Sequence, residues 1–346
     1  MGAAAFLMAE ITHIPYLSIC IAAAIPAVLY YFSLGTVIHL EALKHRLKPL
    51  SELDAVSSSA LIKDSYMLLP VVGLVAFMIQ GYSPFNAAFK GIVIAVAVSF
   101  FKRKTWMTPG KTVAALVSGA KDMIMVAGAC ACAGLIISVA VNTGFALKFT
   151  SLVVSFSQGN FVIASGLIMV SALILGMGVP TTAAYVLAVA VGGPALIRMG
   201  GELLSVHLFV FYFAILACVT PPVALAAYAA AGIAKIDPLK TGLEASKLVF
   251  AGYIIPYMVI YNPGLMLRGS FIEIFLSIAL AFFASFFVAV AMVGYGTKGP
   301  LNFLERSLAL AAAVILPLPI IFDRVSSFFV ALGFVALFMA QQRLSK

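Results

Sequence analysis

Charged residues are scarce in this sequence of 346 residues. Asp, Glu, Lys and Arg together make up 10% of the chain, whereas hydrophobic residues make up 64%. An average soluble domain has about 25% charged and about 45–50% apolar residues. Because no water-soluble fold can bury so much apolar surface, the shortage of charge excludes an ordinary soluble globular protein.

Residue clusters that carry enzyme or metal chemistry are also missing. No apolar segment holds a pair of acids or a histidine-rich turn at helical spacing, as general acid–base catalysis would require. His207 is a lone histidine at the start of an apolar segment, which we interpret as a hydrogen-bonded structural group. The sequence therefore predicts no enzyme and no cofactor. The cysteines lack the CxxC spacing of a zinc or redox site and are interpreted as small packing residues: Cys20, Cys130, Cys132 and Cys218.

A nucleic-acid-binding surface is not indicated either. Lys and Arg number 21 against 12 Asp and Glu, a formal charge of +9, but no basic run alternates with aromatic residues. The basic residues instead gather beside apolar segments, in residues 39–63 and 102–111 and in the C-terminal tail. The positive-inside rule places such loops in the cytoplasm. We therefore expect a multi-pass protein of a bacterial-type inner membrane with a cytoplasmic C-terminus.

Long apolar segments are what the chain has in abundance. They run for roughly 17–25 residues, enough to cross the hydrocarbon core of a bilayer as a helix. Several are apolar on every face, whereas a transmembrane barrel alternates apolar and polar residues. The sequence thus predicts an all-α polytopic membrane protein. The expected spans lie near 16–38, 64–80, 84–101, 203–219, 243–262, 271–296, 304–322 and 325–340.

Two segments interrupt the apolar pattern at what would be membrane depth. Glycines permit positive φ, a proline removes a backbone donor, and threonines supply hydroxyl oxygens and a helix N-cap. The apolar stretch that follows the first interruption is too short to span before a second expected turn at residues 192–194. We therefore predict a re-entrant hairpin over about 160–200. The first interruption consists of Gly176, Met177, Gly178, Val179, Pro180, Thr181 and Thr182.

The second interruption falls at Cys218, Val219, Thr220, Pro221 and Pro222. Two consecutive prolines cannot donate hydrogen bonds, so a broken helix over about 203–234 is expected, with free carbonyls at about 216–219. Such carbonyls are costly in lipid and persist where they line a cavity or hold an ion.

The two interruptions together suggest a binding site. Hydroxyls of Thr181, Thr182 and Thr220, with the free carbonyls, would suit Na⁺, and the helix that begins at Thr181 would favour an anionic solute. The alternative interpretation is that both interruptions are proline kinks with only packing roles.

A faint internal repeat joins the start of the chain to its later part. Duplicated halves, with the site at their interface, build many secondary transporters. Residues 1–15 align with residues 224–238 through shared alanines and a shared proline. After a further shift, Ile25, Pro26 and Tyr31 fall on Ile255, Pro256 and Tyr261.

These motifs resemble those of a known family. Residues 176–187, 207–213 and 220–228 read GMGVPTTAAYVL, HLFVFYF and TPPVALAAY. They closely resemble the large permease subunit of TRAP transporters, above all the fused permeases that work with TAXI-type receptors. The opening MGAAAFLMAE resembles the family segment just after the first-repeat Pro-Pro break.

The resemblance implies an elevator-type, Na⁺-driven importer of organic anions, usually carboxylates, built on an inverted-repeat fold. In that family a periplasmic receptor delivers the solute, and a moving domain holds two hairpins and two broken helices, each pair binding Na⁺. The second pair corresponds to residues 176–182 and 219–222. The first hairpin and the small subunit have no counterpart before Met1. The resemblance thus implies a permease half that needs a missing N-terminal half and small subunit, or a truncated or split-gene fragment without independent transport activity.

On this basis the chain divides into four predicted parts. Residues 1–15 are the remnant of the first-repeat broken helix, and residues 16–110 hold scaffold spans with a cytoplasmic arm. Residues 111–262 form the second-repeat transport domain, and residues 263–346 form additional C-terminal spans.

Overall fold

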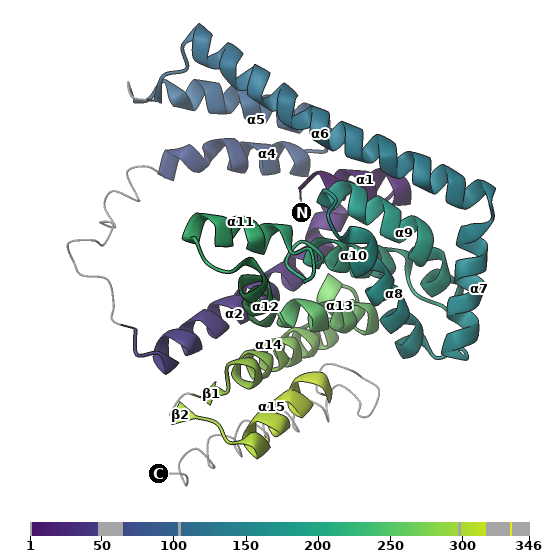
Figure 1. Cartoon of the computed structure of the whole chain (residues 1–346). Coiled ribbons are helices and arrows are strands. Elements are labelled where there is room, and N and C mark those ends of the chain that lie inside the picture. Colours follow the sequence, from purple (N-terminus) through teal and green to yellow (C-terminus); the bar gives the residue numbers. More distant parts are fainter. Residues whose placement is uncertain (1, 48–64, 103–104, 297–298, 316–332, 334–346) are drawn as a thin grey trace. The chain divides into compact units, whose positions relative to one another are not determined.

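A computed structural model describes residues 2–47, 65–102, 105–296, 299–315 and 333. Most of the arm expected over 39–63, the span expected at 325–340 and the C-terminal tail lie outside the described residues. Helices dominate the rest, with one short two-stranded antiparallel pairing (Figure 1).

The helices and strands follow one another along the chain, with the Gly144 and Gln158 turns on either side of α7 (Phe145–Ser157) near its middle. Before α7 come α1 (Gly2–Thr12), α2 (Tyr16–Lys44), the 3₁₀ helix η1 (Ser65–Leu68), α4 (Leu69–Ile79), α5 (Pro84–Ser99) and α6 (Pro109–Asn142). After α7 come α8 (Phe161–Gly176), α9 (Thr181–Arg198), α10 (Leu203–Leu216), α11 (Leu225–Ala234), α12 (Pro238–Leu248), α13 (Ala251–Tyr261), η3 (Pro263–Met266), α14 (Phe271–Val293), β1 (Tyr295–Gly296), β2 (Gly299–Pro300) and α15 (Phe303–Ile315).

Several of these helices are long and apolar enough to cross a membrane. Within the described residues four qualify, Tyr16–Lys44, Thr181–Arg198, Pro238–Tyr261 and Phe271–Val293, and a bent pair formed by Ala131–Ala140 and Phe145–Ser157 would make five. Large apolar side chains remain exposed along the helices, as surfaces that contact lipid require. The prediction of an all-α polytopic membrane protein is confirmed.

Local capping chemistry sets the helix ends. Helix α14 begins with a capping box, in which the Ser270 hydroxyl accepts from the Glu273 N–H and the Glu273 carboxylate accepts from the Ser270 N–H. It ends at Gly294, whose φ of 66° suits glycine. Asn160 is the N-cap of helix α8, and its side-chain oxygen accepts from the backbone N–H groups of Val162 and Ile163.

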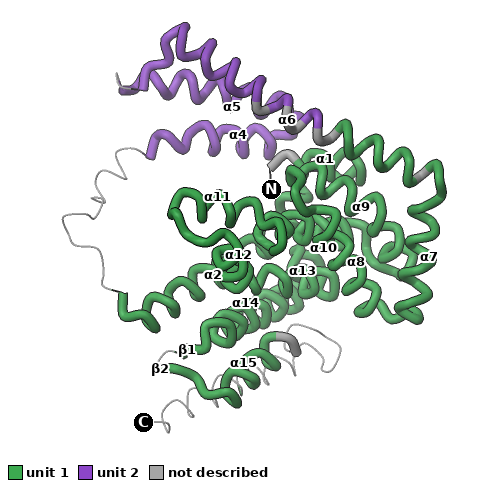
Figure 2. Tube along the Cα trace, viewed as in Figure 1, with its two compact units in different colours: residues 1–14, 18–47, 129–346 green, residues 15–17, 48–128 purple. Residues whose placement is uncertain are grey.

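The chain forms two compact units (Figure 2). Unit 1 holds residues 1–14, 18–47 and 129–346, and unit 2 holds residues 15–17 and 48–128. Within unit 2, α4 and α5 pack against each other across a turn at Gly81, and the Lys90 ammonium lies 3.1 Å from the ring centre of Tyr82.

The core of unit 1 centres on α10, which packs against α8, α9 and α13. Nearly all of its residues are buried, which agrees with a helix that is apolar on every side. Edge-to-face aromatic pairs fill the space around it, with ring centres 4.8 Å apart for Phe209 and Phe213 and 5.1 Å apart for Phe209 and Tyr257. The hairpin of α8 and α9 therefore rests on a rigid helix.

Unit 1 has two ends that its long helices connect. At one end the C-terminal residues of α2 and α14 lie beside the N-terminal part of α15, because the Lys44 ammonium and the Arg306 guanidinium donate to carbonyls of Val293 and Met292. At the other end Phe161, at the start of α8, packs its ring on Tyr261, at the end of α13.

The turn expected at residues 192–194 is absent, which corrects the sequence-based expectation. Helix α9 continues through this stretch to Arg198, with Pro194 inside it. A Cβ at Gly192 would lie 3.0 Å from the Cγ2 atom of Ile168, so the missing side chain lets α8 and α9 pack closely. Gly192 therefore serves the packing of α9 on α8 and does not change the chain direction.

Candidate functional site

A helical hairpin occupies the range in which the sequence predicts a re-entrant one. Helix α8 ends at Gly176, and α9 begins at Thr181 after a short tip. Gly178 at the tip has φ of 76°, which glycine adopts without strain. Pro180 holds the N-cap position of α9, and its carbonyl accepts from the N–H of Ala184 at 2.9 Å. Pro180 thus starts the second arm of the hairpin, whereas the first arm already ends at Gly176.

The broken helix lies next along the chain. Helix α10 ends at Leu216 and α11 begins at Leu225, with an irregular turn between them that contains a cis peptide bond from Pro221 to Pro222. Ala224, fully buried at the end of this turn, has φ of 26°, a backbone conformation that is uncommon for a residue with a side chain.

The hairpin tip packs directly against the break. A Cβ at Gly176 would lie 2.8 Å from the Cβ of Ala217 and 3.0 Å from the carbonyl oxygen of Ala214. A Cβ at Gly178 would lie 3.7 Å from a methyl carbon of Val223. The two interruptions that the sequence marks as separate segments are therefore neighbours in space, with glycine at the closest approach.

The carbonyls expected to be free at the break all have donors. The Leu216 oxygen accepts from the Val219 N–H at 3.0 Å, and the Cys218 oxygen accepts from the Ala226 N–H at 2.9 Å. The Val219 oxygen accepts from the Ser246 hydroxyl at 3.0 Å, a donor that it shares with the Gly242 carbonyl of α12 at the same distance. The expectation of unpaired carbonyls is thus corrected, because the turn and helix α12 supply donors. Each carbonyl oxygen carries two lone pairs. The Cys218 and Val219 oxygens each accept one hydrogen bond and keep a lone pair for a further ligand, whereas the Leu216 oxygen also accepts from the Thr220 hydroxyl.

Thr220 lies in a small polar cluster at the same place. Its hydroxyl lies 2.6 Å from both the Leu216 carbonyl oxygen and the Tyr253 hydroxyl. Ser246 adds a hydroxyl bonded to Val219, as described above. Sequence reasoning missed Tyr253 and Ser246, since nothing in the local pattern of α12 and α13 marks them. Only the folding of these helices against the break brings the hydroxyls to it.

The remaining predicted site residues differ in exposure. Thr181 is exposed at the start of α9 and Thr182 is buried, while Met177 and Pro221 are half-buried and Pro222 is exposed. The contacts between the hairpin tip and the break are made at Gly176 and Gly178. The Thr220 hydroxyl instead turns toward Leu216 and Tyr253.

A cavity of about 400 Å³ adjoins the break. Its wall is mainly apolar and comes from the middle of α2, from α10 and from the turn after it. Its polar side chains are those of Tyr30, Tyr31, Tyr212 and Cys218, and no charged residue of the described part of the chain lines it. This size and lining are typical of a small-molecule pocket.

His207 is buried in the core and has a hydrogen-bond partner there. Its Nδ1 atom lies 2.7 Å from the hydroxyl of Tyr185, and both residues are buried. The pair joins α9 to α10, and the ring of Phe211 packs edge-on against Tyr185. His207 does not line the cavity beside the break, so this geometry agrees with a structural role.

Hydroxyl and carbonyl oxygens gather at the break. Among the described residues no group of three or more His, Cys, Asp or Glu side chains is placed to hold a metal ion. Hydroxyl and carbonyl oxygens are instead the donors that hard cations prefer. The oxygens at the break thus have the chemistry that a hard cation requires, and the cavity of about 400 Å³ lies beside them.

Comparison with known proteins gives one match. A family model described as "Tripartite ATP-independent periplasmic transporter, DctM component" matches residues 1–274 of the chain. No curated protein and no solved structure matches it.

Proposed function

The chain belongs to the DctM family of tripartite ATP-independent periplasmic transporters and is a TRAP-type permease component, and from this premise we propose that it serves Na⁺-coupled import of small organic anions. The family is one of transporters and not of enzymes. One observation carries the proposal: the hairpin tip packs on a helix break around which hydroxyl and carbonyl oxygens gather.

The coupling ion would bind at the break. Thr220 contributes its hydroxyl oxygen, and the carbonyl of Val219, which accepts one hydrogen bond, comes directly before it in the same turn. Ser246 and Tyr253 orient these oxygens from α12 and α13. Thr181 and Thr182, at the N-terminus of α9, would complete the site when the hairpin tip closes on the bound ion and solute.

The solute would lie between the hairpin and the cavity beside the break. The N-terminus of α9 carries partial positive charge and suits a carboxylate group. The cavity offers tyrosine hydroxyls and apolar walls without a charged side chain, so it suits the uncharged body of the solute.

Family membership also supports specific partners. TRAP permeases work with a periplasmic solute receptor and a small subunit. We propose that this chain takes its solute from such a receptor at the outer face of a bacterial-type inner membrane.

The test is Na⁺-dependent uptake into proteoliposomes that hold the chain with its receptor and small-subunit partners. Thr220→Ala should raise the Na⁺ concentration for half-maximal uptake about tenfold, the scale on which metal sites respond to lost orienting groups. Thr36→Ala is the matched control, because its hydroxyl also donates to the carbonyl four residues earlier, at 2.8 Å, but on α2. Equal Na⁺ dependence of the two variants would contradict the site.

A further inference from the structure

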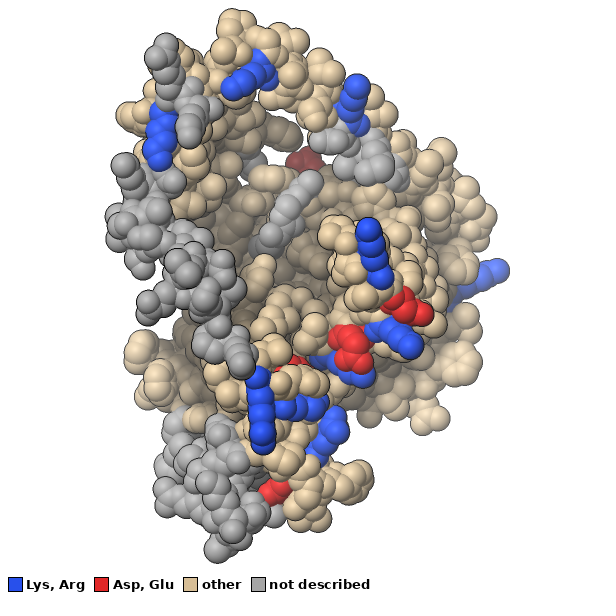
Figure 3. Space-filling model, turned by 60° about the vertical axis from the view of Figure 1, so that its left-hand side comes forward, with Lys and Arg blue, Asp and Glu red and all other residues tan. Residues whose placement is uncertain are grey.

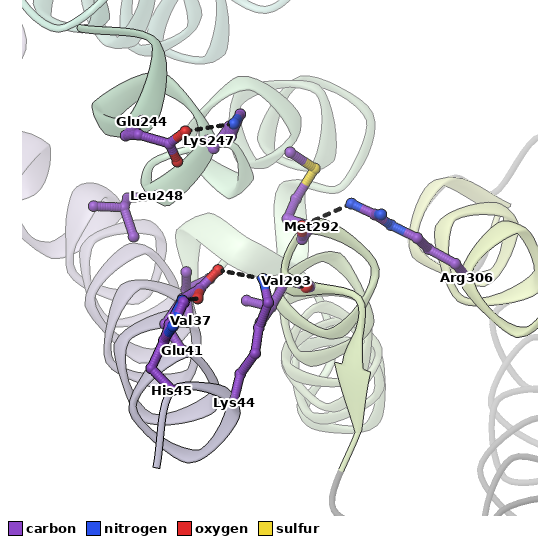
Figure 4. Close-up of a pocket in the computed structure, with 10 residues that line it drawn as sticks. All are labelled: Val37, Glu41, Lys44, His45, Glu244, Lys247, Leu248, Met292, Val293 and Arg306. Atoms are coloured by element: carbon purple, nitrogen blue, oxygen red, sulfur yellow. Dashed lines mark hydrogen bonds and ion pairs between the residues drawn. The ribbon is translucent and has the colours of Figure 1, made fainter. Parts of the chain in front are cut away.

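A second pocket, of about 490 Å³, lies at the end of unit 1 where α2 and α14 terminate. Helices α2, α12, α14 and α15 all contribute to it, and Figure 4 shows charged side chains from three of them around one opening. We propose that this pocket binds the phosphate headgroup of an anionic glycerophospholipid. This function lies outside the transport site and does not depend on it.

The charges of the pocket leave one cation without a carboxylate partner in the described part of the chain. Glu41 lies 3.2 Å from both Lys44 and His45, and Glu244 lies 2.6 Å from Lys247. Each acid is therefore paired with a base of its own helix. The guanidinium of Arg306 bonds only to main-chain carbonyls among the described residues, so its positive charge is available to an anion.

Those carbonyl bonds hold Arg306 in position without neutralising it. Its Nε donates to the Ala291 oxygen at 2.5 Å and its Nη2 to the Met292 oxygen at 2.8 Å, at the C-terminus of α14. A helix C-terminus carries about half a negative charge, which compensates a full positive charge only in part. A guanidinium has five N–H donors, so two carbonyl bonds leave donors for a phosphate group.

Two lysines can assist the same anion. The Lys44 ammonium donates to Glu41 and, at 3.2 Å, to the Val293 carbonyl, so one of its three N–H groups remains. The Lys247 ammonium bonds to Glu244 and is more than half exposed. Basic side chains from α2, α12 and α15 thus converge from separate helices, which no single helical charge pattern would produce. Figure 3 shows basic and acidic side chains lying side by side on one face.

The apolar part of the lining favours a lipid over a free anion. Val37, Leu248 and Met292 line the pocket together with the charged groups. They lie where two membrane-length helices end, at the level at which a bilayer changes from acyl chains to headgroups. A phosphate at Arg306 would therefore continue into acyl chains beside these side chains. Basic pockets between helices on the cytoplasmic side of a membrane bind anionic lipids in this way.

The experiment uses the full chain in nanodiscs, titrated with phosphatidylglycerol or phosphatidylcholine and read out by lipid retention in native mass spectrometry. Phosphatidylglycerol should bind more tightly than phosphatidylcholine. Arg306→Gln should weaken phosphatidylglycerol binding about fivefold, as expected for one basic residue at a membrane surface. The control Arg198→Gln removes an exposed arginine from the last turn of α9 and should leave binding unchanged.

Arg306 also caps α14, so its replacement changes the fold as well as the charge of the pocket. A second variant therefore tests lipid binding without the loss of this cap. Lys247→Gln removes only an exposed ion pair and should still weaken phosphatidylglycerol binding measurably. Equal affinity for the two lipids, or equal effects of Arg306→Gln and Arg198→Gln, would overturn the proposal. Displacement of the lipid by inorganic phosphate at similar concentration would also overturn it, since the site would then be one for a free anion.

Discussion

At the scale of single residues, the proposed site depends on two glycines at the hairpin tip, Gly176 and Gly178. Gly176 lets α8 approach the end of α10 so closely that a methyl group would overlap Ala217. Close contact of this kind fixes the hairpin tip on the break and so links the two halves of the proposed ion site. Glycine is needed here for space, and at Gly178 for its positive φ.

Gly176→Ala should therefore lower the free energy of unfolding by about 1–3 kcal/mol, because the inserted methyl overpacks a tight contact. Gly166→Ala in the same helix is the control, since its Cβ would meet only the Tyr257 hydroxyl, at 3.8 Å. Thermal unfolding in detergent measures both variants. Equal stability of the two would show that the tip does not contact the break as described.

Tyr185 and His207 give a second prediction at this scale. Tyr185→Phe removes the partner of a buried imidazole nitrogen and should cost about 1–3 kcal/mol of unfolding free energy. Tyr228→Phe is the control, because its hydroxyl donates to the Pro222 carbonyl in an exposed position. A smaller loss for Tyr185→Phe than for Tyr228→Phe, in denaturant titrations, would contradict a structural role of the pair.

At the scale of elements, the broken helix is held by its neighbours. The turn after α10 satisfies part of its own backbone, but the Val219 carbonyl depends on Ser246 of α12, and the Thr220 hydroxyl meets Tyr253 of α13. Helix α12, which belongs to the candidate span Pro238–Tyr261, thus also supports the break.

Ser246→Ala should destabilise the fold by about 1–3 kcal/mol, because the half-buried Val219 carbonyl loses its donor. Ser171→Ala is a matched control, since that hydroxyl donates only to the carbonyl four residues earlier, at 2.8 Å. Denaturant titrations that give the free energy of unfolding of both variants test whether Ser246 stabilises the break. If both losses stay within about 0.5 kcal/mol, α12 does not support the break.

The internal repeat predicted from the sequence is accompanied by a repeated order of elements. Helix α1 is followed by His13 at φ of 56° and then by α2, which contains Pro26. Helix α11 is followed by Lys235 at φ of 56° and then by α12 and α13, which contains Pro256. The likeness supports the repeat, which itself stays a prediction.

At the scale of the whole molecule, the two ends of unit 1 should face opposite sides of the membrane. Helices Pro238–Tyr261 and Phe271–Val293 are each long enough to cross between them. Lys44, Lys247 and Arg306 lie at one end, and the positive-inside rule assigns that end to the cytoplasm.

Cysteine labelling in intact cells tests this orientation after the native cysteines are replaced. Lys240→Cys, near the start of α12, should react with a membrane-impermeant maleimide only after lysis. Arg198→Cys, in the last turn of α9, should react before lysis. The same accessibility for both positions would mean that the helices between them do not cross the membrane.

The sequence by itself determined the fold class, the helix break near Pro221 and the tip near Pro180. These follow from composition and from residues whose backbone chemistry acts locally, because proline removes a backbone donor and glycine permits positive φ. The same local reasoning misplaced a turn at residues 192–194, where α9 continues through Pro194 because neighbouring helices pack closely there.

Only the tertiary structure decided what surrounds these breaks. It brought Gly176 against Ala217, gave the Val219 carbonyl a donor from Ser246, and gathered Lys44 and Arg306 at the end of α14. Such contacts join residues far apart in the chain and depend on how whole helices pack. No local pattern encodes them, because helices in a bilayer associate through van der Waals packing and interhelical hydrogen bonds, which depend on how whole side-chain surfaces fit together.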